Sequence, residues 1–115
     1  MKRAEQHRVD RVFHALADAT RRDIVQRAME GEHSVSALAS RYPMSFAAVQ
    51  KHVAVLERAQ LVTKRRHGRE QLVRGNVETV RAAYGLLEQL EEIWRHRMSR
   101  FGEVLADDPE QGAHP

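Results

Sequence analysis

Residues 45–74, SFAAVQKHVAVLERAQLVTKRRHGREQLVR, contain the pattern that decides the fold. In the first half, apolar side chains recur every three or four residues, as is typical of an amphipathic helix. The second half has the pattern of two short strands around a glycine-containing turn, and it is rich in arginine. A compact helix followed by a basic hairpin is an arrangement that can read a DNA groove and bind the backbone beside it.

The helix is expected at 45–59, and the Ser45 hydroxyl is suited to cap its start. If Val49, Val53 and Leu56 point to the core, a step of about 100° per residue defines the opposite, exposed face. The candidates for this groove-facing side are Ala47, Lys51, Ala54 and Arg58, with Ala48 and Gln50 on the flanks. Alanine can contact a thymine methyl, glutamine suits adenine, and lysine suits guanine or phosphate.

Two polar side chains of this helix have more than one interpretation. Ser45 is the expected cap, and its place at a helix N-terminus also allows a phosphate contact. His52 lies about 50° to 60° from the buried direction, at the rim of the packed face. It either bonds to a phosphate or makes a structural contact with a neighbouring helix.

The hairpin is expected to form a basic wing, with strands at 61–66 and 71–74 and a turn at 67–70. Gly68 supplies the positive φ that a tight hairpin often needs. Residues 64–74 hold five cations and one anion, so this stretch carries +4 whereas the whole chain carries +3. The residues expected at the tip, within reach of phosphates or a minor groove, are Arg66, His67 and Arg69. The alternative is a solvated basic loop.

The chain before this region has the pattern of three shorter helices. The first has an apolar face formed by Val9, Val12, Phe13, Leu16 and Ala17. Asp18 is expected to cap a second helix that starts near Ala19 and stops at Gly31. Ser34 is expected to cap a short third helix, and Pro43 then forces a turn before Ser45.

After the wing, Asn76 is expected to cap a final helix that reaches about residue 105 and is roughly 40 Å long. Its apolar side chains recur at close to a heptad spacing, which favours homodimerisation through this helix and the first one. The alternative is a helix that lies across its own domain. The residues expected at the dimer interface are Val12, Leu16, Leu87, Leu90, Trp94, Met98 and Phe101.

Composition limits the class of protein. With 115 residues, we expect one domain over residues 1–106 and a flexible acidic tail at 107–115. The absence of cysteine excludes disulfides, thiolate metal ligands and a nucleophilic thiol. No apolar run is long enough for a signal peptide or a membrane span, so we expect a cytoplasmic protein without a membrane partner. Few aromatic residues are available for base stacking, which favours double-stranded over single-stranded DNA.

Three stretches resemble the ArsR-type (ArsR/SmtB) family of winged helix-turn-helix transcriptional regulators. ALADATRRDIV at 15–25 resembles the family's opening signature, residues 45–62 resemble its recognition helix and exit, and GRE at 68–70 matches its wing tip. The resemblance covers about residues 9–105. It implies a mainly helical fold with a small β-hairpin wing, a dimer held by the first and last helices, and a DNA-binding repressor.

The chain departs from the family pattern at several points. Gln60 stands where glycine is usual after the recognition helix, and Val73 stands where a wing tyrosine is common. The third helix, VSALAS at 35–40, lacks the thiols of metal-sensing members. On the last helix His96 lies between two arginines, which disfavour bound zinc, and His7, His14, His33 and His114 show no ligand spacing. We therefore expect no metal and no cofactor, and the resemblance names no small-molecule effector.

The sequence thus predicts a sequence-specific DNA-binding transcriptional regulator, a homodimeric repressor that binds an inverted-repeat operator through the helix at 45–59 and the wing at 61–74. The alternative is a protein-interaction module whose last helix binds a partner while the wing only aids solubility. An enzyme is not expected, since the sequence offers no cysteine nucleophile, glycine-rich phosphate loop or paired carboxylates. A small apolar ligand near Trp94 would leave the same pattern as an ordinary dimer core.

Overall fold

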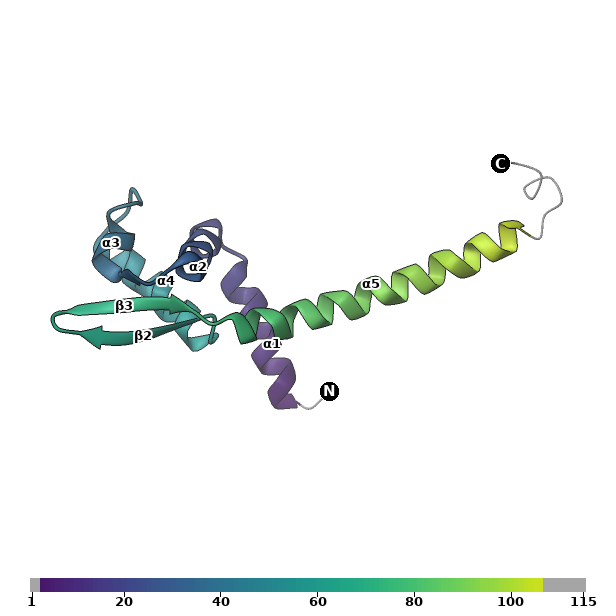
Figure 1. The fold of residues 1–115 in the computed structure, drawn as a ribbon, viewed down its shortest axis with the longest axis horizontal. Helices are drawn as coiled ribbons and strands as arrows, with labels where there is room; N and C mark the ends of the chain where they lie inside the picture. The colour runs from purple at the N-terminus through teal and green to yellow at the C-terminus, as the bar shows by residue number, and fades with distance from the viewer. Residues whose placement is uncertain (1–2, 107–115) are drawn as a thin grey trace. The chain divides into compact units, whose positions relative to one another are not determined.

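The structure, a computed structural model, describes residues 3–106, and the predicted tail at 107–115 lies outside them. The described elements, in chain order, are α1 (Arg3–Leu16), α2 (Ala19–Glu30), β1 (His33–Ser34), α3 (Val35–Ala39), α4 (Phe46–Arg58), β2 (Val62–His67), β3 (Glu70–Gly75) and α5 (Val77–Ala106) (Figure 1). The chain divides into two compact units, one through Ala83 and one from Tyr84. The expected single domain over 1–106 stays a prediction.

Side-chain caps fix the start of the helices, as the sequence predicts. The Asp18 Oδ1 atom accepts a hydrogen bond from the backbone N–H of Arg21 at 3.0 Å, and Ser34 Oγ accepts one from Ala37 at 3.0 Å. Asn76 Oδ1 accepts one from the N–H of Glu78 at 3.3 Å. Each bond satisfies a backbone donor that has no partner inside its helix, so the helix boundaries follow from local chemistry.

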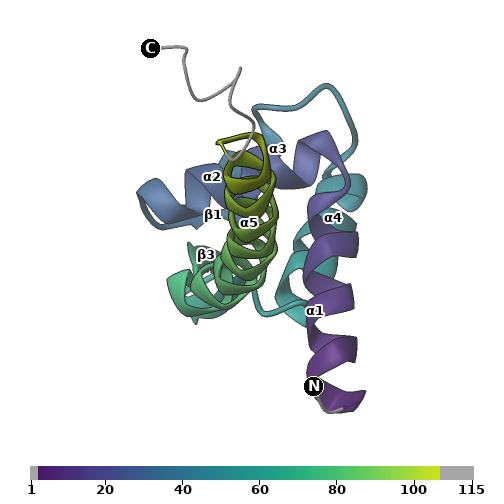
Figure 2. The same ribbon diagram turned by 90° about the vertical axis from the view of Figure 1, so that its right-hand side faces the viewer.

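The core of the first unit lies between the helices and the sheet. Ile24 of α2, Leu38 of α3 and Leu56 of α4 are fully buried together with Val73 of β3. The helix α1 packs on α2 and α4 (Figure 2). Its buried residues are Val12 and Ala15, not the wider apolar face that the spacing predicts.

One prediction for α1 is wrong in detail. The apolar spacing predicts Phe13 on the packed face, but its side chain is 37% exposed. The reason is geometric, because α1 contacts its neighbours along a narrow line through Val12 and Ala15, and Phe13 is rotated about 100° from Val12. The small Ala15 lets the helix approach closely, which an apolar-periodicity argument does not reveal.

The sheet has three antiparallel strands in the order β1-β3-β2. The sequence predicts only β2 and β3, because the two residues of β1 are too few to display a period. The strand β1 pairs His33 with Val73 and Ser34 with Leu72, so the strand β3 is central. The turn of the hairpin is also shorter than predicted by one residue at each end. His67 pairs with Glu70, so the turn has two residues.

The helix α4 is followed by a residue with a left-handed backbone conformation. Gln60 has φ 62°, and among the described residues it is the one residue other than glycine with positive φ. Its N–H donates to the carbonyl of Glu57 at 2.9 Å, and the N–H of Leu61 donates to that of Leu56 at 3.0 Å. This pair of bonds is the Schellman motif, whose left-handed position favours glycine. The absence of glycine here therefore leaves the geometry unchanged and places strain on Gln60.

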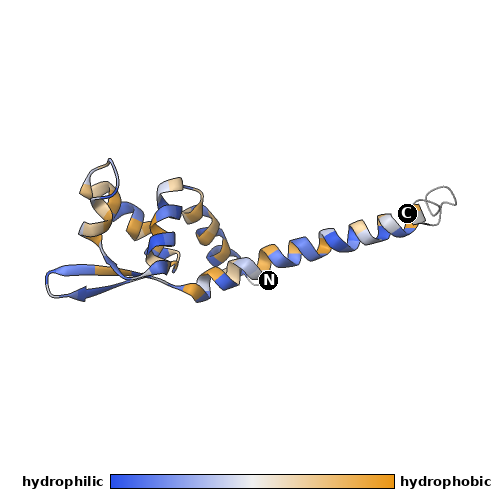
Figure 3. Ribbon diagram, turned by 45° about the horizontal axis from the view of Figure 1, so that its top comes forward, coloured by the Kyte–Doolittle hydropathy of each residue, from blue (hydrophilic) through white to orange (hydrophobic). Residues whose placement is uncertain are grey.

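In the second unit, residues 84–105 of α5 include no buried side chain. Apolar and polar residues alternate along the helix with the expected spacing (Figure 3). Its largest apolar side chains are exposed, among them Leu87, Leu90, Ile93, Trp94, Met98 and Phe101. No described helix combines the length and the apolarity needed to cross a membrane.

Candidate nucleic-acid interface

The helix α4 turns one face to the core and leaves the other free. Val49, Val53 and Leu56 are buried, as predicted. On the opposite side Ala47, Lys51 and Arg58 are exposed, Gln50 on the flank is exposed, and Ala48 and Ala54 are half-buried. The start of this face is set by Ser45, whose Oγ accepts a hydrogen bond from the N–H of Ala48 at 3.1 Å. The predicted cap is thus confirmed, and the free face begins at a helix N-terminus.

A network of side-chain hydrogen bonds fixes the turn that leads into α4. The hydroxyl of Tyr42 donates to Asp23 Oδ2 at 2.6 Å, and Arg27 Nε donates to the same oxygen at 2.9 Å. The hydrogen bonds from Tyr42 and Arg27 lower the pKa of Asp23 below its ordinary value. Burial and the neighbouring carboxylate raise the pKa of Tyr42 to about 12. The turn is therefore tied to α2 through a charged acceptor, which makes strong hydrogen bonds.

The wing ends in a two-residue turn formed by Gly68 and Arg69. Gly68 has φ 63° while Arg69 does not have positive φ, as in a type II′ turn with glycine first. Arg66, His67 and Arg69 are all exposed near this tip. Arg66 Nε donates to the carbonyl of Gly68 at 3.2 Å, so this side chain folds over the turn.

Two of the wing's cations are paired with acidic residues from other elements. Arg65 donates two hydrogen bonds to the carboxylate of Glu32, each 2.9 Å long, and this contact lowers the pKa of Glu32. Lys64 Nζ lies 3.4 Å from Glu57 Oε1 on α4. The count of +4 for residues 64–74 therefore overstates the free charge. These pairs hold the wing against the body of the first unit and leave the arginines nearer the tip for other partners.

A groove of about 210 Å³ separates the start of α4 from the wing. Phe46 and Gln50 line it from the helix, and Lys64, Arg69, Glu70 and Gln71 line it from the hairpin. The sequence pattern did not single out Phe46, whose side chain is 47% exposed. The sequence feature that could have identified Phe46 is an aromatic residue at the first position of the helix. On the helical wheel it lies on the same flank as Gln50.

His52 makes one of the two contacts that the sequence allows. Its ring is half-buried, and Nδ1 lies 3.3 Å from Nη1 of Arg21 on α2. The structural contact with a neighbouring helix is therefore present, while a phosphate contact stays a prediction. Sequence reasoning missed Arg21 because it lies 31 positions before His52 in the chain.

The residues predicted for a dimer interface fall into two groups. Leu87, Leu90, Trp94, Met98 and Phe101 of α5 have exposed fractions between 40% and 59%. Leu16 is half-buried, and Val12 is only 3% exposed. Val12 therefore belongs to the core of its own unit and offers almost no area to another chain.

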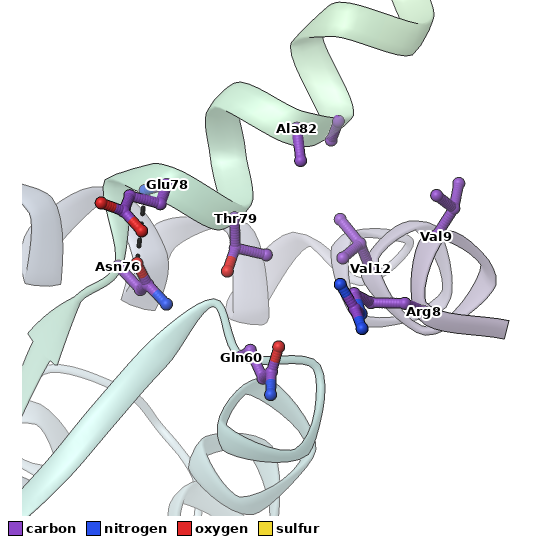
Figure 4. Close-up of a pocket in the computed structure, with 9 residues that line it drawn as sticks. Arg8, Val9, Val12, Gln60, Asn76, Glu78, Thr79 and Ala82 are labelled. Atoms are coloured by element: carbon purple, nitrogen blue, oxygen red, sulfur yellow. Dashed lines mark hydrogen bonds between the residues drawn. The ribbon is translucent and has the colours of Figure 1, made fainter. Parts of the chain in front are cut away.

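A further groove, of about 250 Å³, lies within the first unit between α1 and the start of α5 (Figure 4). Arg8, Val9 and Val12 line one side, and Gln60 and Thr79 line the other. It is distant in sequence from Trp94, the position at which the sequence allows an apolar ligand. Within residues 3–106, no group of three or more histidine, aspartate or glutamate side chains is arranged to hold a metal ion. The expected lack of a metal site stays a prediction.

Known proteins share this architecture. The HTH-type transcriptional regulator Rv2034 of Mycobacterium tuberculosis is 33% identical to the chain over 96 residues, which cover 84% of this chain and 87% of that protein. No protein-family model matches the chain.

Two solved structures extend the comparison. An ArsR-like transcriptional regulator from Rhodococcus sp. RHA1 superposes with a TM-score of 0.75 at 29% identity, covering 88% of this chain and 95% of that one. The homodimeric winged helix-turn-helix DNA-binding domain of Mb0332 from Mycobacterium bovis has a TM-score of 0.64 at 28% identity, covering 81% and 87%. The identity to a transcriptional regulator over most of both chains, together with the shared fold, shows that the chain belongs to the ArsR family of winged helix-turn-helix, DNA-binding transcriptional regulators.

Proposed function

We propose that the chain is a homodimeric repressor that binds an inverted-repeat operator with the free face of α4 and the tip of the wing. The observation that carries this proposal is the groove between the two, which brings Gln50 of α4 within one recess of Arg69 and Gln71 of the wing. A helix that enters a major groove must let the DNA backbone pass beside it. Arg69 in the lining of the recess supplies a cation for that backbone, with the carboxylate of Glu70 next to it in the chain.

Each predicted contact residue takes a role from its position. Ala47, Ala48 and Lys51 stand where base edges would lie, and Gln50 stands at the wing side of the same helix. Arg66, His67 and Arg69 at the wing tip are suited to phosphates or an adjacent minor groove. Ser45 and His52 border the face at the helix N-terminus and at its rim, where phosphates run.

Dimerisation is supported by the exposed apolar stripe of α5. Five large apolar side chains at close to a heptad spacing need a partner to leave water, and a coiled-coil-like contact is a common solution. The Mb0332 domain, which shares the fold, is homodimeric. A second copy of this chain is therefore the partner that we infer, with Leu87, Leu90, Trp94, Met98 and Phe101 of α5 in the contact. Leu16 of α1 stays a predicted contact residue.

A symmetric dimer implies a symmetric operator. Two recognition helices in successive major grooves require half-sites about 34–36 Å apart, which is one helical turn of DNA. A dimer seated there covers the promoter and represses transcription by excluding the polymerase. A regulator of this kind acts on chromosomal DNA, so we infer that it works in the cytoplasm.

The test is fluorescence anisotropy with DNA from upstream of the chain's own gene and with a scrambled duplex of equal length, each at two salt concentrations. We expect tight, salt-sensitive preference for the upstream DNA. For about eight phosphate contacts, log K falls with log salt at a slope near −7. Equal and weak binding to both duplexes would mean nonspecific binding or an operator that lies elsewhere. No binding at low salt would favour a protein-interaction role for α5.

A further inference from the structure

Arg21 joins three elements of the first unit through one guanidinium group. Its Nε donates to the carbonyl of Ala15 at 2.8 Å and its Nη2 to that of His14 at 3.3 Å, so it bonds to two carbonyls in the last turn of α1. Its Nη1 lies 3.3 Å from Nδ1 of His52 on α4. The backbone N–H of the same residue is held by Asp18. Arg21 is therefore fixed at its base and at its tip.

This contact decides which nitrogen of His52 carries the proton. A guanidinium has five N–H donors, no acceptor, and keeps its charge in proteins. The Nδ1 atom of His52 must therefore accept the hydrogen bond from Arg21. In a neutral imidazole one nitrogen accepts and the other donates, so the proton resides on Nε2.

The Nε2 atom is open to an outside partner. Within residues 3–106, no buried side-chain nitrogen or oxygen lacks a hydrogen-bond partner. The ring of His52 is half-buried, and Nδ1 is the nitrogen that bonds to the protein. The Nε2–H group therefore meets solvent, at the rim of α4.

The position of His52 indicates what this donor would meet. On the helical wheel, His52 and Gln50 lie on opposite flanks of the exposed face of α4. Gln50 borders the wing, and His52 borders α2. A helix in a major groove has a DNA backbone along each flank, and neutral N–H groups commonly bond to phosphate oxygens there.

We propose that Arg21 is a positioning residue that holds His52 in its Nε2–H form, and that this N–H donates to a DNA phosphate on the flank of α4 away from the wing. The inference rests on the proposed function, since it requires α4 to enter the groove. It assigns one contact to each of the two DNA backbones that border the major groove. The basic wing binds one backbone, and the imidazole of His52 binds the other.

The first test measures the tautomer in the free protein, so it does not depend on DNA. Long-range proton–nitrogen NMR correlations of uniformly ¹⁵N-labelled protein at pH 8 should show His52 with a protonated Nε2 and a bare Nδ1. In Arg21→Met, the preference for this tautomer should weaken while the signals of His96 stay unchanged. A protonated Nδ1 in the unsubstituted protein would overturn the proposal.

The second test separates the two nitrogens by substitution. His52→Asn places an amide oxygen near the position of Nδ1 and removes the outer donor, whereas His52→Gln places an amide N–H near the position of Nε2. Against a duplex recovered from a random pool by selection with the unsubstituted protein, we expect His52→Asn to lose about tenfold or more in affinity. His52→Gln should stay within about threefold.

The controls distinguish a phosphate contact from a general loss of structure. His96→Asn, on the side of α5 opposite the apolar stripe, should bind DNA as the unsubstituted protein does. Neither His52 substitution should change the salt slope, since a neutral donor releases no counterion. Equal losses in His52→Asn and His52→Gln, or no loss in either, would overturn the proposal. If the unsubstituted protein selects no duplex, the proposed function fails while the tautomer measurement still stands.

Discussion

The first unit and the C-terminal part of α5 use the same residue types in opposite ways. Through Ala83, leucine, isoleucine and valine side chains are buried against one another, and Leu38, Leu56 and Leu61 have no exposed surface. From Tyr84 onward no described side chain is buried, although Leu87, Leu90 and Trp94 are as apolar. Because burial of apolar surface is the main driving force for folding, the first unit is stabilised by its own contacts. The second unit lacks such contacts among its described residues, and this is why we propose a partner for it.

The largest effect should come from the same substitution made once in each region. Leu56→Ala removes a fully buried side chain and should lower the free energy of unfolding by about 2–5 kcal/mol. Leu90→Ala, at a side chain that is 55% exposed, should change the unfolding of the first unit little. Urea denaturation followed by circular dichroism measures both. Similar losses at low protein concentration would show that α5 is already buried in the single chain.

A charged side chain in the apolar stripe of α5 should weaken the inferred dimer contact. Trp94→Glu places a carboxylate in the inferred dimer contact and should weaken dimerisation by about 2–4 kcal/mol, as expected for a central aromatic anchor. Equilibrium sedimentation at micromolar concentration measures the mass. The matched control is Gln89→Glu, which introduces a carboxylate at an exposed position on the side of the helix away from the stripe. A monomer mass for the unsubstituted chain would remove the dimer from the proposal.

Within the first unit, two cations should reduce affinity in different ways when they are replaced. Lys51→Ala should reduce discrimination between operator and random DNA by about 1–3 kcal/mol if Lys51 contacts a base. Arg69→Ala should weaken binding to all sequences alike and reduce the salt slope of the proposed dimer by about 2, since each of the two subunits loses one phosphate interaction. Anisotropy titrations against both duplexes at several salt concentrations distinguish these outcomes. Equal losses on both duplexes for Lys51→Ala would make it a phosphate contact.

A substitution at the strained end of α4 should stabilise the chain, by less than Leu56→Ala destabilises it. Gln60→Gly should raise the free energy of unfolding by about 0.5–1 kcal/mol, because glycine adopts the left-handed conformation without a Cβ penalty. Gln26→Gly, in the exposed interior of α2, should instead lower it by about 1 kcal/mol. Thermal unfolding of the two variants under one condition makes the comparison. A loss in both would mean that the left-handed geometry carries no cost.

The smallest effect should be an acid sensitivity of the first unit. Hydrogen bonds from Tyr42 and Arg27 lower the pKa of Asp23 in the folded chain, so the unfolded chain binds more protons in acid. The stabilisation is present above about pH 4 and is lost as the pH falls through the lowered pKa. Melting temperatures from pH 3 to 7 should fall at the acid end, and less steeply in Asp23→Asn. Asp10→Asn, on the exposed side of α1, is the control and should follow the unsubstituted protein.

Much of the fold could be predicted because its signals are local. The caps Asp18, Ser34, Ser45 and Asn76 act on backbone N–H groups two or three residues away, so the sequence alone reveals them. The buried face of α4 and the glycine of the wing follow equally from periodicity and turn chemistry.

The parts that could not be predicted depend on residues far apart in the chain. The strand β1 exists because β3 pairs with it, and the Arg65–Glu32 and Arg21–His52 contacts join residues 33 and 31 positions apart. Periodicity also could not show that Ala15 rather than Phe13 would be buried. No local pattern contains these partners, since loop closure and side-chain packing choose them.

The sequence by itself determined where the capped helices begin, which face of α4 is free, and that α5 carries an apolar stripe. The physical reason is that capping, turn conformation and side-chain period act over a few residues. Only the tertiary structure decided that Lys64 and Arg65 hold the wing in place, that Gln60 is strained, and that Arg21 orients His52. Those outcomes depend on distances of a few ångströms between elements, which only the packed fold sets.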